Sequence, residues 1–264
     1  MIIIAERINA TISSVKEIIL NRDAQGLLGL ARRQAEAGAN YIDLNVSTGV
    51  GSPEDEIKAM EWAVETIQGE LEIPLCIDSS NPAVLAAGLK SCRGKPAMLN
   101  STKAEQKSFE EVIPLAKEYS TPLVALTMDE SGIPKSVKDR VRAGEKIVEA
   151  CKHYEFPIEN VFFDLLVMPI STDVTQGLTT LTAVTEIKKE FPGCRTVLGI
   201  SNISFGLPGR ARLNAGFLHM AAYAGLDAAI VDLLNKEMVV AVRTAELLSG
   251  KDKDCRNYLR VFRQ

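Results

Sequence analysis

The chain has 264 residues, of which 46% are hydrophobic and 24% are charged, and its formal net charge at pH 7 is -4. This composition is typical of a globular protein with a large core, and the slight negative charge argues against non-specific binding to nucleic acid. No apolar run reaches the roughly 18 residues of a membrane span, so no membrane protein is expected. The length suits one barrel-sized domain, and we expect residues 1–264 to form a single domain.

The chain contains eight short β-rich runs, about 30 residues apart, and nearly every run ends at a carboxylate or a carboxamide. In chain order, the polar residues at the ends of these runs are Glu6, Asp43 with Asn45, Asp78, Asn100, Asp129, Asp164, Asn202 and Asp232. Eight such runs separated by helical patterns predict an α/β fold, a closed (β/α)8 TIM barrel. The carboxyl ends of its strands surround one mouth, where we expect these side chains to gather.

Amphipathic patterns between the runs predict the outer helices. Apolar spacing predicts a helix at about 54–68, and the capping-box pattern from Thr102 to Glu105 predicts a helix at about 103–118. Similar amphipathic patterns cover 138–151 and 174–189. The longest strand-to-helix connections, at 128–137, 165–176 and 202–215, should form the rim of the mouth, where substrate loops usually lie.

The cysteines and histidines give no sign of a metal site. The five cysteines contain no CxxC pair, and the N-terminal MIIIAERIN lacks the basic region of a secretory signal and reads as a first strand. We therefore expect free thiols and a cytoplasmic location. His153 and His219 lie in predicted outer helices, so neither a histidine metal site nor a histidine acid–base mechanism is expected.

Four strand-end residues are the candidates for chemistry at the mouth: Asp78, Asn100, Asp164 and Asn202. Buried carboxylates are costly unless hydrogen-bond donors pair with them, and few Lys or Arg residues lie beside these in the sequence. A neutral, flat ligand rich in N–H donors would satisfy them. The 2-amino and N3–H edge of a pterin offers a carboxylate two parallel donors, and an amide serves the other ring nitrogens. The alternative is that these residues cap the helices that follow.

Phosphate binding is not favoured, since the runs that end at Asn202 and Asp232 lack the glycine-rich loops of phosphate-binding barrels. Two cationic residues, Arg210 and Arg212, lie beyond the seventh run. They either meet an anionic ligand tail, such as the glutamate of a folate, or form a solvated pair at the start of a helix.

Seven motifs carry a resemblance to a known family: ERIN (6–9), AGANYIDLNVST (37–48), LCIDSSN (75–81), MLNST (98–102), LTMDESGIPK (126–135), LGISNIS (198–204) and GLDAAI (225–230). Through these motifs the whole chain resembles the pterin-binding methyltransferases. That family includes methyltetrahydrofolate:corrinoid/iron-sulfur protein methyltransferase and the folate domain of cobalamin-dependent methionine synthase. Residues 37–48 also resemble dihydropteroate synthase more distantly, although Leu44 and Asn45 replace its characteristic glycine pair.

The resemblance implies a barrel, usually a homodimer, that binds tetrahydrofolate or 5-methyltetrahydrofolate in its mouth. It also implies methyl exchange between N5 of the folate and a corrinoid carried by a partner protein. By position, Asp78, Asn100 and Asp164 match residues that hold the pterin, and Asn202 matches the asparagine near N5. The residues that match the surrounding folate-binding shell are Glu6, Asn9, Asp43, Asn45 and Ser201, and Arg210 is the candidate for the glutamate tail.

The expected catalytic residues are Asn202, which can donate or accept as charge changes at N5, and Asp78 and Asp164, which with water could relay a proton. The resemblance has two departures. Leu165 and Leu166 follow Asp164 where the acetogen-type enzyme has Pro-Leu, and FGLPGR (205–210) looks closer to methionine synthase and to demethylation-pathway enzymes. They favour transfer from a methylcorrinoid protein to tetrahydrofolate in a demethylation pathway, over transfer from methyltetrahydrofolate to a corrinoid/iron-sulfur protein in acetyl-CoA synthesis.

Three further interpretations stay open from the sequence. The first is a condensing enzyme similar to dihydropteroate synthase, which would need a pyrophosphate site. The second is a non-catalytic folate-binding protein. The third is an unrelated barrel that binds Mg²⁺ through Asp43, Asp78, Asp164 and Asp232.

Overall fold

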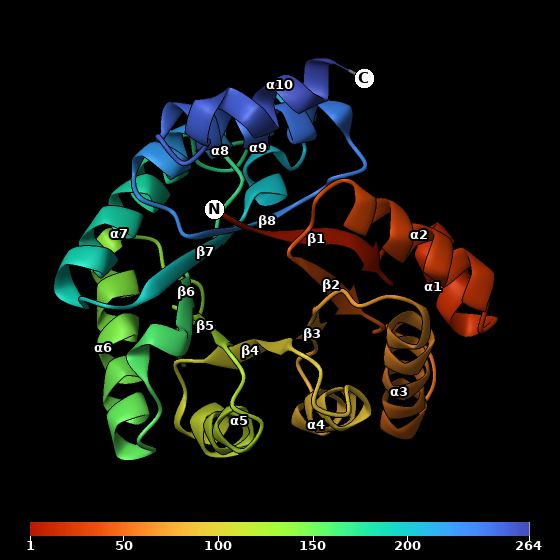
Figure 1. The fold of residues 1–264 in the computed structure, drawn as a ribbon. Coiled ribbons are helices and arrows are strands. Elements are labelled where there is room, and N and C mark those ends of the chain that lie inside the picture. Colours follow the sequence, from red (N-terminus) through yellow and green to blue (C-terminus); the bar gives the residue numbers. More distant parts are fainter. Residues whose placement is uncertain (264) are drawn as a thin grey trace.

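The computed structural model describes residues 1–263, and its strands form one closed, all-parallel barrel in which each strand pairs with its neighbours in chain order (Figure 1). The strands are β1 (Ile2–Asn9), β2 (Tyr41–Asn45), β3 (Leu75–Asp78), β4 (Ala97–Lys103), β5 (Leu123–Leu126), β6 (Val161–Asp164), β7 (Arg195–Gly199) and β8 (Ala228–Val231). The predicted (β/α)8 barrel is confirmed.

Helices surround the strands on the outside (Figure 1). The α-helices are α1 (Ser13–Leu20), α2 (Ala24–Glu36), α3 (Pro53–Glu70), α4 (Pro82–Ser91), α5 (Gln106–Glu118), α6 (Val137–His153), α7 (Gln176–Glu190), α8 (Arg210–Tyr223), α9 (Lys236–Leu248) and α10 (Arg256–Phe262). Three 3-10 helices are η1 (Ile158–Asn160), η2 (Ile200–Ser204) and η3 (Lys253–Cys255). Within the described residues, no helix is long and apolar enough to cross a membrane.

The expected helices at 54–68, 138–151 and 174–189 are confirmed as α3, α6 and α7, with ends that differ by a few residues. The capping box predicted from Thr102 to Glu105 is wrong. Thr102 and Lys103 continue β4 and pair with β5, and α5 begins at Gln106 without a side-chain cap. The Thr102 hydroxyl lies 2.9 Å from that of Ser108 instead.

The barrel interior has an apolar floor beneath a polar mouth. Side chains alternate along each strand, so every second residue points inward. One inward layer forms a closed apolar cluster, which consists of Ile4, Cys76, Met98, Val124, Phe162, Val197 and Ala228. Residues one pleat further towards the strand ends are polar on several strands, among them Glu6, Asp43, Asp78, Asn100 and Asp164. A layer of packed apolar side chains therefore closes the barrel below the polar groups.

Strand register brings four polar ends to one level. Asn9 pairs with Asn45, Asn45 with Asp78, and Asp78 with Asn100, so an unbroken polar arc crosses β1 to β4. Asp164 ends β6 across the mouth and pairs with Leu126 and Val197.

Four predicted strand ends are wrong. Strand β1 continues past Glu6 to Asn9, and β4 continues past Asn100 to Lys103. Strand β7 ends at Gly199, and Asn202 lies in the following 3-10 helix η2. Strand β5 ends at Leu126, and Asp129 lies beyond it in a turn. The Asp129 carboxylate accepts hydrogen bonds from the Ser131 hydroxyl and from Nζ of Lys146. Asp129 therefore belongs to an ion cluster with Lys146 on α6, and not to the polar side chains at the strand ends. The expected long connections on the rim are present as 127–136, 165–175 and 200–209, although the third was predicted to reach residue 215 and α8 already begins at Arg210.

Candidate active site

Two carboxylate–amide pairs form the centre of the polar arc. Asn45 donates from Nδ2 to Oδ2 of Asp78 across 2.9 Å, and Asn100 donates from Nδ2 to Oδ1 of Asp43 across 3.2 Å. The register that aligns β2, β3 and β4 brings these side chains together. Helix capping, the alternative reading of Asp78 and Asn100, does not occur here: Asn81 caps α4 instead, by accepting from the Ala83 N–H.

The pKa values of this pair of acids are raised. Burial is the largest cause for Asp43, and the nearby charge of Asp78 adds to it, while the hydrogen bond from Asn100 opposes both. Burial also raises the pKa of Asp78, against the hydrogen bond from Asn45. Cys76, in the layer beneath, has a pKa raised by burial and by Asp43, so it stays a thiol. The arc therefore holds protons more tightly than exposed carboxylates do.

Asp164 faces this arc from the end of β6. Burial raises its pKa to about 6, although the Leu166 N–H and the charge of Arg140 act in the opposite direction. Its Oδ1 accepts the Leu166 N–H at 2.8 Å. At neutral pH, Asp164 is therefore mainly a carboxylate and can accept hydrogen bonds from a ligand.

Arg140 on α6 supports the segment after Asp164, and the sequence analysis missed it. Its guanidinium is fully buried and donates to the carbonyl oxygens of Leu165 (2.6 Å) and Leu166 (3.1 Å), and to Oε1 of Gln176 (3.4 Å). A signal was present in the sequence, because Arg140 lies on the buried face of α6 three residues before Ala143. A cation within the apolar stripe of an amphipathic helix indicates buried acceptors.

The loop after β7 is hydrogen-bonded to β1, which lies on the far side of β8. Ser201 donates from Oγ to Oε1 of Glu6 on β1, 195 residues away in the chain. Arg210, the first residue of α8, donates to the Ser201 carbonyl oxygen (2.8 Å) and to Oγ of Ser204 (3.1 Å). Burial raises the pKa of Glu6 to about 7, partly offset by its bond with Ser201. The structure thus places Glu6, Ser201 and Arg210 in one cluster.

Asn202 lies within that loop and is exposed. Among residues 1–263, no hydrogen bond to its side-chain amide is present. Its Nδ2 is close to Gly199, where an added Cβ would lie only 3.1 Å away. The amide is consequently available to a ligand as either donor or acceptor.

Asn9, the remaining predicted site residue, ends β1 but serves the backbone. Its Oδ1 accepts from the N–H and the hydroxyl of Thr11, at 2.9 and 2.7 Å. Asp232, just after β8, lies 3.6 Å from Arg7 and accepts the Leu234 N–H. Both residues shape the rim on the β8–β1 side, and Oδ1 of each already accepts a hydrogen bond.

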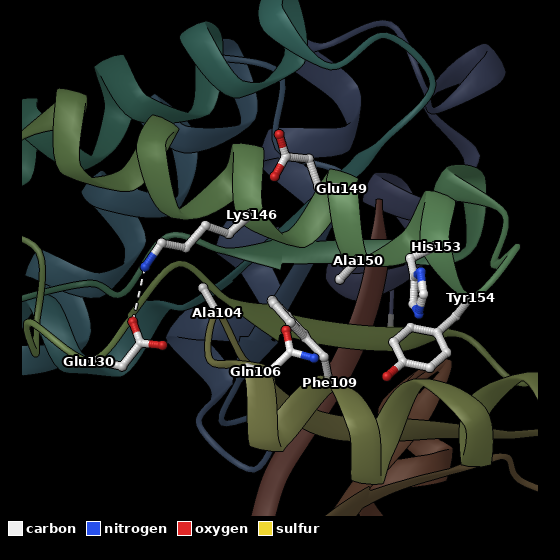
Figure 2. A pocket seen from close by; sticks show the side chains of 9 residues that line it. All are labelled: Ala104, Gln106, Phe109, Glu130, Lys146, Glu149, Ala150, His153 and Tyr154. Atoms are coloured by element: carbon white, nitrogen blue, oxygen red, sulfur yellow. Dashed lines mark hydrogen bonds and ion pairs between the residues drawn. The ribbon is translucent and has the colours of Figure 1, made fainter.

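A separate cavity of about 470 Å³ lies outside the barrel, between α5 and α6 (Figure 2). Figure 2 shows Lys146 extended towards Glu130 and His153 beside Tyr154, with ring centroids 4.8 Å apart. His153 and His219 lie in the outer helices α6 and α8, as predicted. None of the polar residues of the mouth lines this cavity.

The mouth suits a ligand that supplies N–H donors. Within residues 1–263, no hydrogen bond reaches Oδ1 of Asp78 or Oδ2 of Asp164, so each acid retains a free acceptor. An edge of two parallel N–H groups matches such a carboxylate. In the part of the chain that the structure describes, no group of three or more His, Cys, Asp or Glu side chains is placed to hold a metal ion. The magnesium interpretation therefore has no geometric support.

Comparisons with known proteins identify the family of the chain. The family model described as pterin binding enzyme matches residues 5–232. The chain is 35% identical over its whole length to the methylcorrinoid:tetrahydrofolate methyltransferase of Eubacterium limosum, of which it covers 97%. It is 33% identical over 88% of its length to methionine synthase of Mycobacterium leprae, and spans 20% of that protein. Dihydropteroate synthase of Yersinia pestis shares the fold, with a TM-score of 0.72 over 94% of each chain at 17% identity. The chain belongs to the family of pterin-binding enzymes.

Proposed function

We propose that this protein transfers a methyl group from a methylated corrinoid protein to N5 of tetrahydrofolate, forming 5-methyltetrahydrofolate. The observation that carries the proposal is the full-length similarity to the methylcorrinoid:tetrahydrofolate methyltransferase of Eubacterium limosum. The similarity to methionine synthase covers a fifth of that protein and supports the same class of chemistry.

Pterin binding is assigned to the acids with free acceptors. Asp164, ionised at neutral pH, and Asp78 accept from the N–H donors of the pterin, while Asn100 and Asn45 hold the neighbouring carboxylates in place. Each ligand N–H then takes the place of water at one of these carboxylate oxygens and forms a charge-assisted hydrogen bond. The apolar floor excludes water from below the ring.

The amide of Asn202 is assigned the hydrogen bond to N5, the reacting nitrogen of tetrahydrofolate. N5 attacks the methyl carbon, the N5–C bond forms, and the Co–C bond breaks with both electrons remaining on cobalt, so Co(III) becomes Co(I). N5 gains positive charge and then releases its proton, which Asp78, Asp164 and water could carry away. An amide can turn to accept from the N–H and afterwards donate to the lone pair, so Asn202 follows the change without titrating.

The rim provides a surface for the corrinoid-carrying protein. Four apolar side chains on strand-to-helix loops are exposed, namely Val50, Ile133, Val174 and Phe205. Val174 is 82% exposed and Phe205 is 65% exposed, on the loops after β6 and β7. Apolar groups around a mouth are typical of a binding surface. Docking there would bring the cobalt to N5, and such proximity supplies much of the rate.

The proposal includes a single barrel domain, a homodimer and a cytoplasmic location. Support for a dimer comes from an open cavity between α7 and α8, which is lined by Leu181, Met220 and the 95% exposed Tyr223. A cytoplasmic location agrees with the free thiols of the five cysteines. Sedimentation velocity on the purified chain tests the dimer.

The function is tested by mixing the protein anaerobically with methylcob(III)alamin and tetrahydrofolate and recording the appearance of Co(I) by absorbance. Asn202→Ala should lower the rate by a factor on the order of 10²–10³, as removal of one transition-state hydrogen bond does. The variant should keep the unfolding midpoint of the wild type, because the side chain is exposed.

Asn257→Ala on α10, another exposed asparagine, is the matched control and should retain full activity. Folate binding is titrated in the same samples. Tetrahydrofolate binding without exchange, even with a methylated corrinoid protein as donor, would select the non-catalytic folate-binding protein. Absence of folate binding would overturn the proposal altogether.

A further inference from the structure

The loop that carries Asn202 is held on both sides of that residue, while the Asn202 side chain has no hydrogen bond within the described part of the chain. Ser201 donates to Glu6 on β1, and Arg210 donates to the carbonyl oxygen of Ser201 and to the hydroxyl of Ser204. Every one of these contacts falls on a residue that flanks Asn202 within η2. The arrangement is a clamp around an amide that makes no side-chain hydrogen bond with any other residue of 1–263.

In this clamp, Glu6 and Arg210 contact the loop that carries Asn202, which is a role other than contact with the folate. We propose that Glu6 and Arg210 are positioning residues that hold Asn202 at the reacting nitrogen by fixing Ser201 and Ser204, and that ionised Glu6 is the form that does so. This inference rests on the proposed methyl transfer and deepens it, because it assigns the groups on which Asn202 depends.

A clamp is needed because η2 is a short 3-10 helix, whose own hydrogen bonds are poor in geometry. Its amide must stay within hydrogen-bonding range of N5 while the charge on that nitrogen changes. A misplacement of about 1 Å in such a group can cost on the order of a hundredfold in rate. Strand β1 pairs with β2 and β8 in the closed barrel, so the bond from Ser201 to Glu6 ties the loop to the barrel wall.

The charge on Glu6 adds a dependence on pH. The charged groups that face it are Arg7, Arg210, Asp43 and Asp232. Burial is the largest cause that raises the pKa of Glu6 to about 7, Asp232 adds to it, and the Ser201 bond and the two arginines oppose it. Below that pH the carboxyl is neutral, and it loses both the charge-assisted bond from Ser201 and the attraction to Arg210. The clamp therefore tightens as the pH rises through about 7.

A double-mutant cycle between Glu6 and Asn202 tests the inference, with methylcob(III)alamin and tetrahydrofolate as substrates. Glu6→Gln keeps an acceptor for Ser201 but cannot ionise. We expect it to lower kcat about tenfold to a hundredfold with the KM for tetrahydrofolate within about twofold, and to remove the inflection near pH 7. In the Asn202→Ala background, Glu6→Gln should change kcat less than about twofold, because its effect passes through the amide.

Equal losses in both backgrounds would overturn the inference, and so would a rise in KM without a fall in kcat, which would make Glu6 a folate contact. Glu65→Gln is the matched control: it removes a carboxylate that pairs with Arg93 on the outer helices, and should leave kcat unchanged. If the wild type transfers no methyl group at all, the proposed function fails, and the inference about Glu6 and Arg210 fails with it.

Gly199→Ala gives a second approach that leaves the clamp in place. The new Cβ would lie 3.1 Å from Nδ2 of Asn202, closer than an ordinary contact, and should displace the amide. We expect kcat to fall about tenfold while the inflection near pH 7 remains, since Glu6 and Ser201 are untouched. An unchanged kcat would show that the placement of Asn202 is not critical, which contradicts the role given to Glu6.

Discussion

Arg140 on α6 donates from Nε to the carbonyl oxygen of Leu165 across 2.6 Å, and so links an outer helix to the residue that follows the acid at the end of β6. The same guanidinium reaches the carbonyl oxygen of Leu166, whose N–H holds Asp164. Leu166 has a φ of 56°, a left-handed conformation unusual for a branched side chain. The buried cation therefore stabilises the backbone turn that orients Asp164.

Replacement of this cation should affect both stability and folate binding. Arg140→Met leaves the carbonyl oxygens of Leu165 and Leu166 buried and unpaired, at a cost of about 1–3 kcal/mol for each unsatisfied group. We expect the free energy of unfolding in urea to fall by about 2–5 kcal/mol and the affinity for tetrahydrofolate to fall as well.

The neighbouring Arg142→Met is the control for that variant. Arg142 is half exposed and lies 3.5 Å from Asp139, a surface ion pair of the kind that contributes about 0–1 kcal/mol. Equal destabilisation by the two substitutions would contradict the role assigned to Arg140.

Folate binding should depend on the charge of Asp164. Its pKa is about 6 in the folded protein, and N–H donors of a bound pterin favour the carboxylate over the acid. Tetrahydrofolate affinity should therefore fall as the pH is lowered through about 6. Asp164→Asn should weaken binding about tenfold to a hundredfold at about pH 8 and should reduce this pH dependence. Isothermal titration calorimetry across this range measures both effects, and unchanged affinity would remove Asp164 from the pterin site.

Protein stability should respond to the proton on Glu6. The pKa of this group is about 7 in the folded state against 4.5 in its unperturbed form, so the folded state binds the proton more tightly. Its contribution to stability is fully present below about pH 4.5 and is lost as the pH rises through about 7. Relative to the wild type, Glu6→Gln should gain up to about 3 kcal/mol between about pH 5 and pH 8. Urea unfolding at both values checks this, and a difference that does not vary with pH would contradict it.

The apolar rim should matter for the protein-bound corrinoid alone. Phe205→Ser and Val174→Ser remove exposed side chains, so each should change the free energy of unfolding by less than about 0.5 kcal/mol. Together they should raise the KM for the methylated corrinoid protein about tenfold while the rate with free methylcob(III)alamin stays the same. Leu248→Ser on α9, also exposed, is the control. An unchanged KM for the corrinoid protein would place docking elsewhere.

The helices and strands could be predicted from the sequence because their signals are local. Short β-rich runs about 30 residues apart indicate the strands, and apolar spacing of three or four indicates α3, α6 and α7. At Thr102 and Lys103 the local sequence resembles a helix cap, but both residues pair with β5. Strand pairing therefore decides their structure, and they belong to β4. The end of β7 was also misjudged, because nothing in the letters of LGISNIS separates a strand from a 3-10 helix.

The candidate site was predictable in part, since strand order alone brings Asp78, Asn100 and Asp164 to the mouth of a barrel. Their partners were not predictable. The pairing of Asn45 with Asp78 depends on the register of two strands, and that of Ser201 with Glu6 depends on closure of the barrel over 195 residues. Arg140 was missed because its acceptors are backbone carbonyls, which no residue type identifies.

The sequence by itself determined the barrel, the polar character of its mouth and the acids that line it, because the hydrophobic period and the residue at each strand end are written locally. Only the tertiary structure decided which acid retains a free acceptor, which amide makes no hydrogen bond among residues 1–263, and which carboxyls have pKa values raised towards neutrality. Those properties depend on burial and on distances between groups far apart in the chain, and burial is what raises the pKa of Glu6 and of Asp164.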